Sequence, residues 1–361
     1  MMAIASKWEY CTMKNFATSF LLFCISAVLL SGCSGSEQVV TERPEHGTDS
    51  RYMSATGSDF LKGEVKKGLE SVKRVHNTVA YRTYQFSLDD LPTRRELEEA
   101  DLMQRSVQTM MDHESKAGSA LILSNRGGKT VLITAAHTVT FPDTLWHYTE
   151  EGGGNPDDLV EAVSVRQSRT HFVIGSRNIY DFDVAAADPN RDLAFMVRSW
   201  ESGDRPHLTP LALSVGSSGD LDWTDQVYAI GYPMGMEMVT RAMVSRSTQT
   251  ERRSFVLDAS FNRGFSGGSV FAERADGSGM EWVGMLSSAS GGQEEYLVPE
   301  RDQEREFRPD LEYTGAIYTQ RSQRINYGIT YAVGIDEVKQ FYNENRALLN
   351  DQGIRIPILE E

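Results

Sequence analysis

Cysteine is almost absent from this sequence of 361 residues. The three that occur, Cys11, Cys24 and Cys33, lie close to the N-terminus and leave the body of the chain without any. The body therefore has no disulfide framework, no cysteine-based zinc site and no cysteine nucleophile. His-Glu-x-x-His, phosphate-loop, EF-hand and dinucleotide-binding motifs are missing as well, so we expect no metal, calcium or nucleotide cofactor.

Positive charge is also scarce, because 36 Lys and Arg residues oppose 51 Asp and Glu residues and leave a formal net charge of −15. An acidic surface repels the phosphates of nucleic acids and the head groups of anionic lipids. We therefore expect neither nucleic acid as a partner nor a membrane bound through a basic patch. The composition, 40% hydrophobic and 24% charged, is ordinary for a globular protein.

The N-terminal segment contains an apolar run, Phe16–Leu30, that is shorter than the roughly 20 residues of a membrane-spanning helix. The run follows Lys14, and a basic residue before a short apolar run predicts the core of a signal peptide. Met13 directly precedes Lys14, so the sequence leaves open whether translation starts at Met1 or at Met13.

The residues Leu30-Ser31-Gly32-Cys33, at the end of this run, resemble a bacterial lipobox. The resemblance implies that residues 1–32 are removed and that Cys33 is lipidated, which would anchor the protein on the periplasmic side of the bacterial cell envelope. Ser34 then favours the outer membrane over the inner one. A plain secretory peptide cut near Gly32 is the alternative.

Composition also divides the rest of the chain. Ser34–Gly57 is rich in Ser, Thr, Gly and Glu, and we predict a flexible tether over residues 33–75. A globular domain is predicted over residues 76–350, with a C-terminal tail over residues 351–361.

Short apolar or alternating runs, broken by Gly, Asp, Asn and Pro, fill most of the predicted domain, and this pattern favours an all-β barrel or sandwich. The predicted strands are Ser119–Leu123, Thr130–Thr134, His171–Gly175, Leu193–Val197, Gln226–Ile230, Ser254–Leu257, Ser269–Ala272, Glu281–Leu286 and Ile329–Val333. Two helices are predicted, over Pro92–Asp112 before the barrel and over Ile335–Leu349 after it. The apolar residues near helical spacing in the second helix are Val338, Phe341 and Leu348.

Three short motifs contain the residue types used in nucleophilic catalysis. Leu132–His137 is a strand that ends in small residues and a histidine, and Arg191–Val197 places Asp192 at the entry of an apolar strand. In Asn262–Ser269, glycines flank Ser266, as a nucleophilic serine requires when it projects from a tight turn with converging N–H groups. Each motif alone is common, but the order His, Asp, Ser, with separations of 55 and 74 residues on an all-β pattern, connects them.

This combination resembles the trypsin-like serine peptidases of the chymotrypsin fold. Gly118–Ala120 is similar to the family's strand before the histidine, and Ala229–Pro233 is similar to a segment common in its HtrA/Deg-like branch. Gly328–Val333 and Ile335–Val338 are similar to the substrate-binding strand and the closing helix of that branch. The resemblance covers residues 115–348.

The resemblance implies an all-β fold of two antiparallel β-barrels of the chymotrypsin type, with the active site between them. Barrel one is expected over residues 76–205, barrel two over residues 206–335 and a closing helix over residues 335–349. We expect the branch without a PDZ domain, because few residues follow the closing helix.

The family's triad carries over onto Ser266 as nucleophile, His137 as general base and Asp192 as the residue that orients the imidazole. The backbone N–H groups of Gly264 and Ser266 are expected to form the oxyanion hole. Asp192 is preferred because the family's Asp-Leu-Ala pattern falls on it. The aspartates left open as alternatives are Asp183 and Asp188.

The resemblance also implies that the substrate is a peptide or an unfolded protein. Ser260 is expected at the base of the pocket for the side chain before the scissile bond, and since it carries no charge we expect a medium-sized apolar residue there. Tyr331, Ala332 and Val333 are expected along the pocket wall, and the substrate backbone is expected to pair with the Ile329–Val333 strand. Relatives in this branch often form homo-oligomers, and that option stays open.

Three features depart from the family pattern. Phe265 stands where Asn or Asp is usual. One of two insertions, around Glu150–Asp158, predicts an exposed loop. Residues 288–325 form a longer insertion, interpreted either as a solvated, partly disordered excursion or as a lid or exosite. These departures keep a second hypothesis open, in which a protease-fold lipoprotein binds or senses peptides with little or no turnover.

Overall fold

The structure, a computed structural model, describes residues 54–149, 155–175, 178–201, 206–245, 255–299 and 317–360. All of these residues belong to one compact unit. The predicted signal peptide and Cys33 lie outside the described residues. Within the described ranges, no helix is long and apolar enough to cross a membrane.

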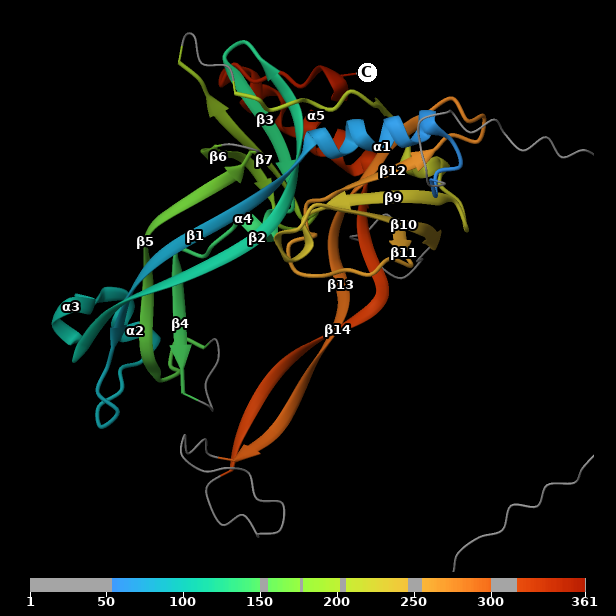
Figure 1. Cartoon of the computed structure of the whole chain (residues 1–361). Helices are drawn as coiled ribbons and strands as arrows, with labels where there is room; N and C mark the ends of the chain where they lie inside the picture. Colours follow the sequence, from blue (N-terminus) through green and yellow to red (C-terminus); the bar gives the residue numbers. More distant parts are fainter. Residues whose placement is uncertain are drawn as a thin grey trace, which may run out of the picture. The chain divides into compact units, whose positions relative to one another are not determined.

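Barrel one is a closed antiparallel sheet (Figure 1). Its strands are β1 (Val72–Gln85), β2 (Gln108–Arg126), β3 (Lys129–Thr134), β4 (Thr144–Tyr148), β5 (Val160–Ile174), β6 (Ile179–Asp188) and β7 (Leu193–Ser199). They are ordered β1-β2-β3-β7-β6-β5-β4, and a further pairing of β1 with β5 closes the barrel, with β4 beside β5. Alternate residues such as Ala120 and Ile122 on β2 are fully buried in its core.

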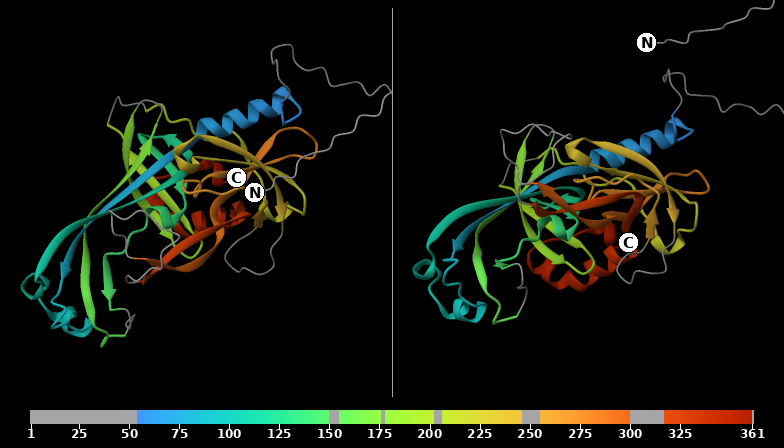
Figure 2. Two further views of the ribbon diagram at one scale, coloured as in Figure 1. Left: turned by 60° about the horizontal axis from the view of Figure 1, so that its bottom comes forward. Right: turned by 90° about the horizontal axis from the view of Figure 1, so that it is seen from below.

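Strands β1, β2 and β5 continue past the barrel to a small second core (Figures 1 and 2). The register pairs Gln85 with Gln108, and the connection between these residues contains helices α2 (Arg94–Glu99) and α3 (Leu102–Arg105). The buried residues of this second core are Phe86, Leu97, Val160 and Val163. The segment is therefore an ordered extension of barrel one.

The helix predicted over Pro92–Asp112 is wrong in extent and in position. Thr93 and Glu96 form a reciprocal cap at the start of α2, but helical structure ends at Arg105. Gln108–Asp112 instead pairs with β1, because a ladder with a neighbouring strand outweighs local helix propensity. Since β1 comes before this segment, α2 and α3 lie within barrel one and do not precede it.

Barrel two is also closed by antiparallel pairing. Its strands are β8 (Ser214–Val215), β9 (Gln226–Gly231), β10 (Met238–Ser245), β11 (Phe255–Leu257), β12 (Ser269–Glu273), β13 (Met280–Pro299) and β14 (Ile317–Gly334). They are ordered β12-β9-β10-β11-β14-β13-β8, and β12 pairs with β13 to close the barrel, while β8 is added beside β13 in a parallel pairing. Short helical segments are η1 (Ser218–Asp220), η2 (Pro233–Gly235) and η3 (Pro357–Leu359). The predicted all-β fold of two barrels is confirmed.

One hydrophobic cluster connects both barrels and the closing helix α5 (Ile335–Asp351). It includes Phe195 from barrel one, Trp282 from barrel two and Phe341 from α5. The rings of Phe195 and Phe341 are stacked, with centroids 4.9 Å apart. Because this core is shared, the two barrels are held in one arrangement, and side chains from each can meet at a common site.

Every predicted strand overlaps an observed strand, but β2, β5, β13 and β14 extend well beyond the predicted bounds, and β1, β4, β6, β8 and β10 were not predicted. The predicted closing helix is confirmed as α5, but Leu348 is exposed and the next residue, Leu349, takes its place in the core. Leu349 follows Phe341 and Tyr342 on the buried face at helical spacing.

Helix α1 (Asp59–Ser71) and the first barrel strand occupy part of the predicted tether, residues 33–75. The helix packs closely on barrel two, since a side chain at Gly68 would place its Cβ 2.8 Å from Ile230 Cδ1. The tether prediction is therefore wrong from residue 59 onward, and barrel one begins at Val72 and not at residue 76.

The predicted insertion over residues 288–325 is, where described, an extension of the β13–β14 hairpin. β13 pairs with β14 from Gly284 opposite Gly334 to Pro299 opposite Ile317, with register shifts after Leu286 and after Ala289. Residues 300–316 between the strands lie outside the described part. Paired strands thus replace the expected disordered excursion over these residues. The predicted insertion around Glu150–Asp158 is exposed at residues 155–157, and residues 150–154 are not described.

Candidate active site

His137 lies on the short helix α4 (Ala136–Val139), directly after strand β3 (Figure 1). Two backbone N–H groups tie this helix to the β6–β7 connection: Ala136 donates to the Asp192 carbonyl oxygen (3.2 Å) and His137 donates to Asp192 Oδ1 (2.9 Å). The imidazole Nδ1 lies 2.9 Å from both carboxylate oxygens of Asp192. Main-chain and side-chain hydrogen bonds together therefore bring His137 and Asp192, which are 55 residues apart in the sequence, into contact.

Asp192 has a left-handed backbone, with a φ of +60°. It is the last residue of the connection between Asp188 and Leu193, which face each other as the closing pair of the β6–β7 hairpin. Left-handed positions at hairpin ends favour Gly, Asn and Asp, so an aspartate fits both the turn and the hydrogen bonds to His137.

The two alternative aspartates have other partners. Asp188 accepts the N–H groups of Asn190 and Arg191 within the turn and pairs with the Arg191 guanidinium at 3.2 Å. Asp183 is exposed on β6. Among the described residues, the only aspartate hydrogen bonded to the His137 side chain is Asp192.

Arg191 connects the Asp192 turn to the closing helix. Its guanidinium binds Glu344 through two hydrogen bonds of 2.5 and 2.8 Å and lies 3.3 Å from Glu337 Oε2. The hydrogen bonds to Glu344 raise the pKa of Arg191, and those from Arg191 lower the pKa of Glu344. The turn that carries Asp192 is thereby fixed to α5 from one side and to α4 from the other.

The segment before Ser266 forms a tight turn in which the Phe265 N–H donates to the Asn262 carbonyl oxygen (3.0 Å). Gly264, at the third position, has a φ of +95°, as a type II turn requires. A side chain there would also place its Cβ 2.5 Å from the Tyr232 carbonyl oxygen. Gly264 is thus demanded both by its backbone conformation and by the close approach of a neighbouring chain segment.

Ser266 is nearly buried, with 7% of its surface exposed, and its Oγ lies 3.0 Å from His137 Nε2. The next two N–H groups are used inside the protein, because Gly267 donates to Leu286 (2.7 Å) and Gly268 donates to Phe265 (2.9 Å). Over the described chain, no internal hydrogen bond is made by the N–H groups of Gly264 and Ser266. Within the described chain both N–H groups thus remain without an acceptor, as the predicted oxyanion hole requires.

Ser119 joins the barrels at this point, a role that was not predicted. Its N–H donates to the Ser266 carbonyl oxygen (2.7 Å), and its hydroxyl donates to the Gly264 carbonyl oxygen (2.8 Å). The same hydroxyl accepts the Tyr232 N–H (2.8 Å). A fully buried serine of barrel one thus holds the turn of barrel two that carries Ser266, and only the Gly118–Ala120 motif had marked its position.

Ser287 is a second residue that sequence reasoning missed. Its hydroxyl donates to Asp192 Oδ2 at 2.5 Å, so the carboxylate accepts hydrogen bonds from the His137 backbone, the His137 ring and Ser287. A carboxylate that accepts several hydrogen bonds is fixed in orientation. A serine at the end of an apolar strand carries no sequence signal that would have predicted this contact.

Phe265, which departs from the family pattern, is fully buried in the core of barrel two and packs against Phe261 at 6.0 Å between ring centroids. A side chain at Gly231 would place its Cβ 2.5 Å from the Phe265 ring, so Gly231 is needed to make room. The turn is anchored here by apolar burial, and the backbone of Phe265 keeps its place in the turn.

The predicted substrate strand is wrong, because residues 330–332 of β14 pair with β11 on one side and with β13 on the other. A strand with both edges occupied cannot add a substrate strand. Ala332 and Val333 are fully buried in the cores and offer no surface to a substrate, while Tyr331 is half-buried. Ser260 is exposed between β11 and the nucleophile turn, and its place in a pocket stays a prediction.

A free strand edge lies instead on β13. Strand β12 pairs with β13 only as far as Met285, and Leu286 exchanges hydrogen bonds with Gly267 and Gly268. From Ser287 onward, the strand pairings of the described backbone join β13 to β14 alone. The opposite edge of β13 therefore begins beside Ser266 and can accept an extended peptide.

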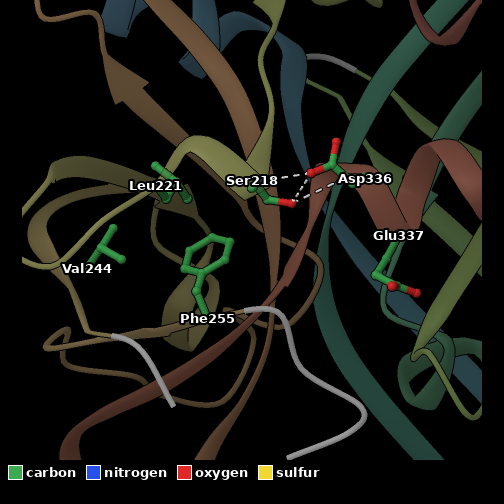
Figure 3. Close-up of a pocket in the computed structure, with 7 residues that line it drawn as sticks. Ser218, Leu221, Val244, Phe255, Asp336 and Glu337 are labelled. Carbon is green, nitrogen blue, oxygen red and sulfur yellow. Dashed lines mark hydrogen bonds between the residues drawn. The ribbon is translucent and has the colours of Figure 1, made fainter. Parts of the chain in front are cut away.

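A cavity occurs elsewhere, between η1 and the start of α5 (Figure 3). It is lined by Ser218, Gly219, Leu221, Val244, Phe255, Asp336 and Glu337. Asp336 accepts hydrogen bonds there from Ser218 Oγ (2.7 Å) and the Gly219 N–H (3.0 Å), which ties η1 to the first turn of α5. None of the three candidate catalytic residues lines this cavity. In the part of the chain that the structure describes, no group of His, Cys, Asp and Glu residues could hold a metal ion.

Two kinds of comparison with known proteins give matches. Residues 118–284, somewhat less than half of the chain, match the family model of the trypsin-like peptidase domain. A solved structure of an HtrA-type protease with a tripeptide aligns at 16% identity and a TM-score of 0.42, and the match spans 79% of this chain and 63% of that one. Among curated proteins there is no match. Over residues 118–284, the chain is therefore similar to the trypsin-like peptidase domain.

Proposed function

We propose that the protein is a serine endopeptidase that hydrolyses peptide bonds through an acyl-enzyme intermediate. The observation that carries the proposal is the row of contacts from Ser266 Oγ to His137 Nε2 (3.0 Å) and from His137 Nδ1 to Asp192 (2.9 Å). The three residues come from separate segments on two barrels, in the arrangement that activates a serine.

In the proposed first step, Ser266 Oγ attacks the carbonyl carbon of the scissile peptide while its proton moves to His137 Nε2. The C–N bond then breaks, and the same proton passes from Nε2 to the leaving amine. Water attacks the resulting ester in the second half of the reaction and gives a proton to Nε2. That proton then passes to Ser266 Oγ as the acid is released, which restores the hydroxyl.

Asp192 would keep the Nδ1–H tautomer of His137, so that Nε2 is the basic nitrogen. It would also stabilise the imidazolium that forms in each half-reaction. The N–H groups of Gly264 and Ser266 would hold the oxyanion of the tetrahedral intermediates, an interaction worth roughly 2.7–4 kcal/mol for each donor.

Labelling with a fluorophosphonate probe tests this function, because only an activated serine reacts with the probe. We expect the wild type to be labelled and the Ser266→Ala variant to remain unlabelled. Ser214→Ala is the matched control, since it removes an exposed hydroxyl on β8, outside the proposed site, and should retain labelling. Absence of labelling in folded wild type would reject the peptidase and favour the second hypothesis, a peptide-binding or sensing protein.

We also propose that the protein is lipid-anchored through Cys33 on the periplasmic side of a bacterial envelope, where its substrates would be envelope proteins. The support is the lipobox-like sequence before Cys33. Incorporation of radiolabelled palmitate into the wild type, and its loss in Cys33→Ala, tests the anchor. Processing of the wild type without palmitate incorporation would instead indicate a plain secretory peptide.

A further inference from the structure

The turn η2, between β9 and β10 (Figure 1), presents a methionine in a strained backbone conformation. Met234 has a φ of +52°, yet the residue is 66% exposed. Long side chains avoid the left-handed region, and such conformations persist where the surroundings fix them, often at functional sites. An exposed apolar residue gains nothing from this strain in the free protein, so the neighbours of Met234 matter.

The turn is held from three directions. The Tyr232 N–H donates to Ser119 Oγ (2.8 Å), and the Tyr232 hydroxyl donates to Glu237 Oε1 (2.7 Å). Burial is the main reason that the pKa of Tyr232 is raised, with Glu237 adding to it, so the phenol stays protonated as a donor. Gly235 lies against Arg74, since a Cβ at this glycine would meet the guanidinium at 2.9 Å. The position of Met234 is thus fixed before any ligand arrives.

The nucleophile segment lies between this turn and β13. On one side, the Met234 N–H donates to the Arg263 carbonyl oxygen (2.7 Å), immediately before Gly264. On the other side, Gly267 and Gly268 exchange hydrogen bonds with Leu286 of β13. A peptide whose acyl part pairs with the free edge of β13 would therefore place the residues after its scissile bond on the side of Met234.

We propose that Met234 forms an apolar subsite that selects a hydrophobic side chain in the first two residues after the scissile bond. The inference rests on the proposed peptidase function. Met236, two residues further along, is 61% exposed and extends the apolar surface of the same turn. Methionine suits this role because its flexible, polarisable side chain adapts to apolar partners of different shape.

Digestion of unfolded casein, with the cleavage sites counted by mass spectrometry, tests the subsite whatever residue the enzyme prefers before the scissile bond. We expect hydrophobic residues in the first two positions after the cut to be enriched about fourfold over casein composition, the effect of one buried methylene group. Met234→Asn and Met234→Gly should lose this enrichment, and both residues accept a positive φ. Met234→Leu should keep it.

Met243→Asn is the matched control, because Met243 is 49% exposed on β10 but has no hydrogen bond to the nucleophile turn among those of the described residues. It should leave both the cleavage rate and the enrichment unchanged. The fluorophosphonate probe carries no residue after the reacting bond, so labelling reports on Ser266 separately from the subsite.

The outcomes separate the two proposals. A wild type that is labelled but cuts casein without enrichment, or does not cut it, overturns the subsite and leaves the activated serine standing. Equal enrichment in the wild type and in labelled Met234→Gly protein also overturns it. A folded wild type that is neither labelled nor proteolytic rejects the peptidase itself, and the subsite with it.

Discussion

Replacement of Asp192 by asparagine tests whether this residue orients the imidazole. The substitution leaves the left-handed turn intact, because Asn accepts a φ of +60° as readily as Asp does. It reduces the number of hydrogen bonds that the side chain can accept. Three donors point at the carboxylate in the structure: the His137 N–H, the His137 ring at Nδ1 and the Ser287 hydroxyl.

An amide has one oxygen, so it cannot satisfy donors that reach both carboxylate oxygens. Where the amide NH2 faces Nδ1, the ring must carry its proton on Nε2, and Nε2 then cannot take the proton of Ser266. Loss of the correct tautomer in a serine triad lowers kcat roughly ten-thousand-fold. At about 1.36 kcal/mol for each factor of ten, this corresponds to about 5 kcal/mol of transition-state stabilisation.

The rate of fluorophosphonate labelling and the hydrolysis of casein both measure this effect, and a thermal melt shows whether the variant is folded. We expect Asp192→Asn to melt within a few degrees of the wild type. Asp183→Asn is the control, since Asp183 was an alternative third member and is exposed on β6. Labelling of folded Asp192→Asn at more than one tenth of the wild-type rate would refute the reasoning.

The remaining predictions concern the surroundings of the site and a buried histidine. Ser287→Ala should lower kcat about tenfold with little change in KM, because it removes one charge-assisted hydrogen bond, typically worth about 1.5–3 kcal/mol, to Asp192; an unchanged kcat would contradict the positioning role. Gly264→Ala should abolish labelling and lower the melting temperature, since its Cβ would lie 2.5 Å from the Tyr232 carbonyl oxygen. Burial, with a smaller effect from Arg169, lowers the pKa of His171 to about 4. Below its unfolded pKa of about 6.5, the unfolded chain binds more protons, so the free energy of unfolding should fall by up to about 1.4 kcal/mol per pH unit between pH 6.5 and 4. Denaturant titrations at several pH values should show this slope in the wild type and a smaller one in His171→Gln.

Local sequence patterns predicted the β-strands of the cores, because an alternating or continuous apolar run favours a buried strand wherever that strand lies in the fold. Leu193–Val197 and Gln226–Ile230 are examples in which the apolar run and the strand coincide. Local patterns failed at Gln108–Asp112, where the composition favours a helix and a ladder with β1 fixes a strand. The partner strand is distant in sequence, so no local pattern predicts this outcome.

The sequence by itself determined the residue types and the order of the candidate triad, since a nucleophilic serine between glycines and a histidine after a strand are local motifs. Only the tertiary structure distinguished Asp192 from Asp183 and Asp188, because the choice depends on which carboxylate the β6–β7 turn brings to His137. It also showed that both edges of β14 are paired at residues 330–332, and revealed the contacts of Ser119 and Ser287. These contacts depend on strand pairing and on the distances between the two barrels, and the core that the barrels share fixes those distances.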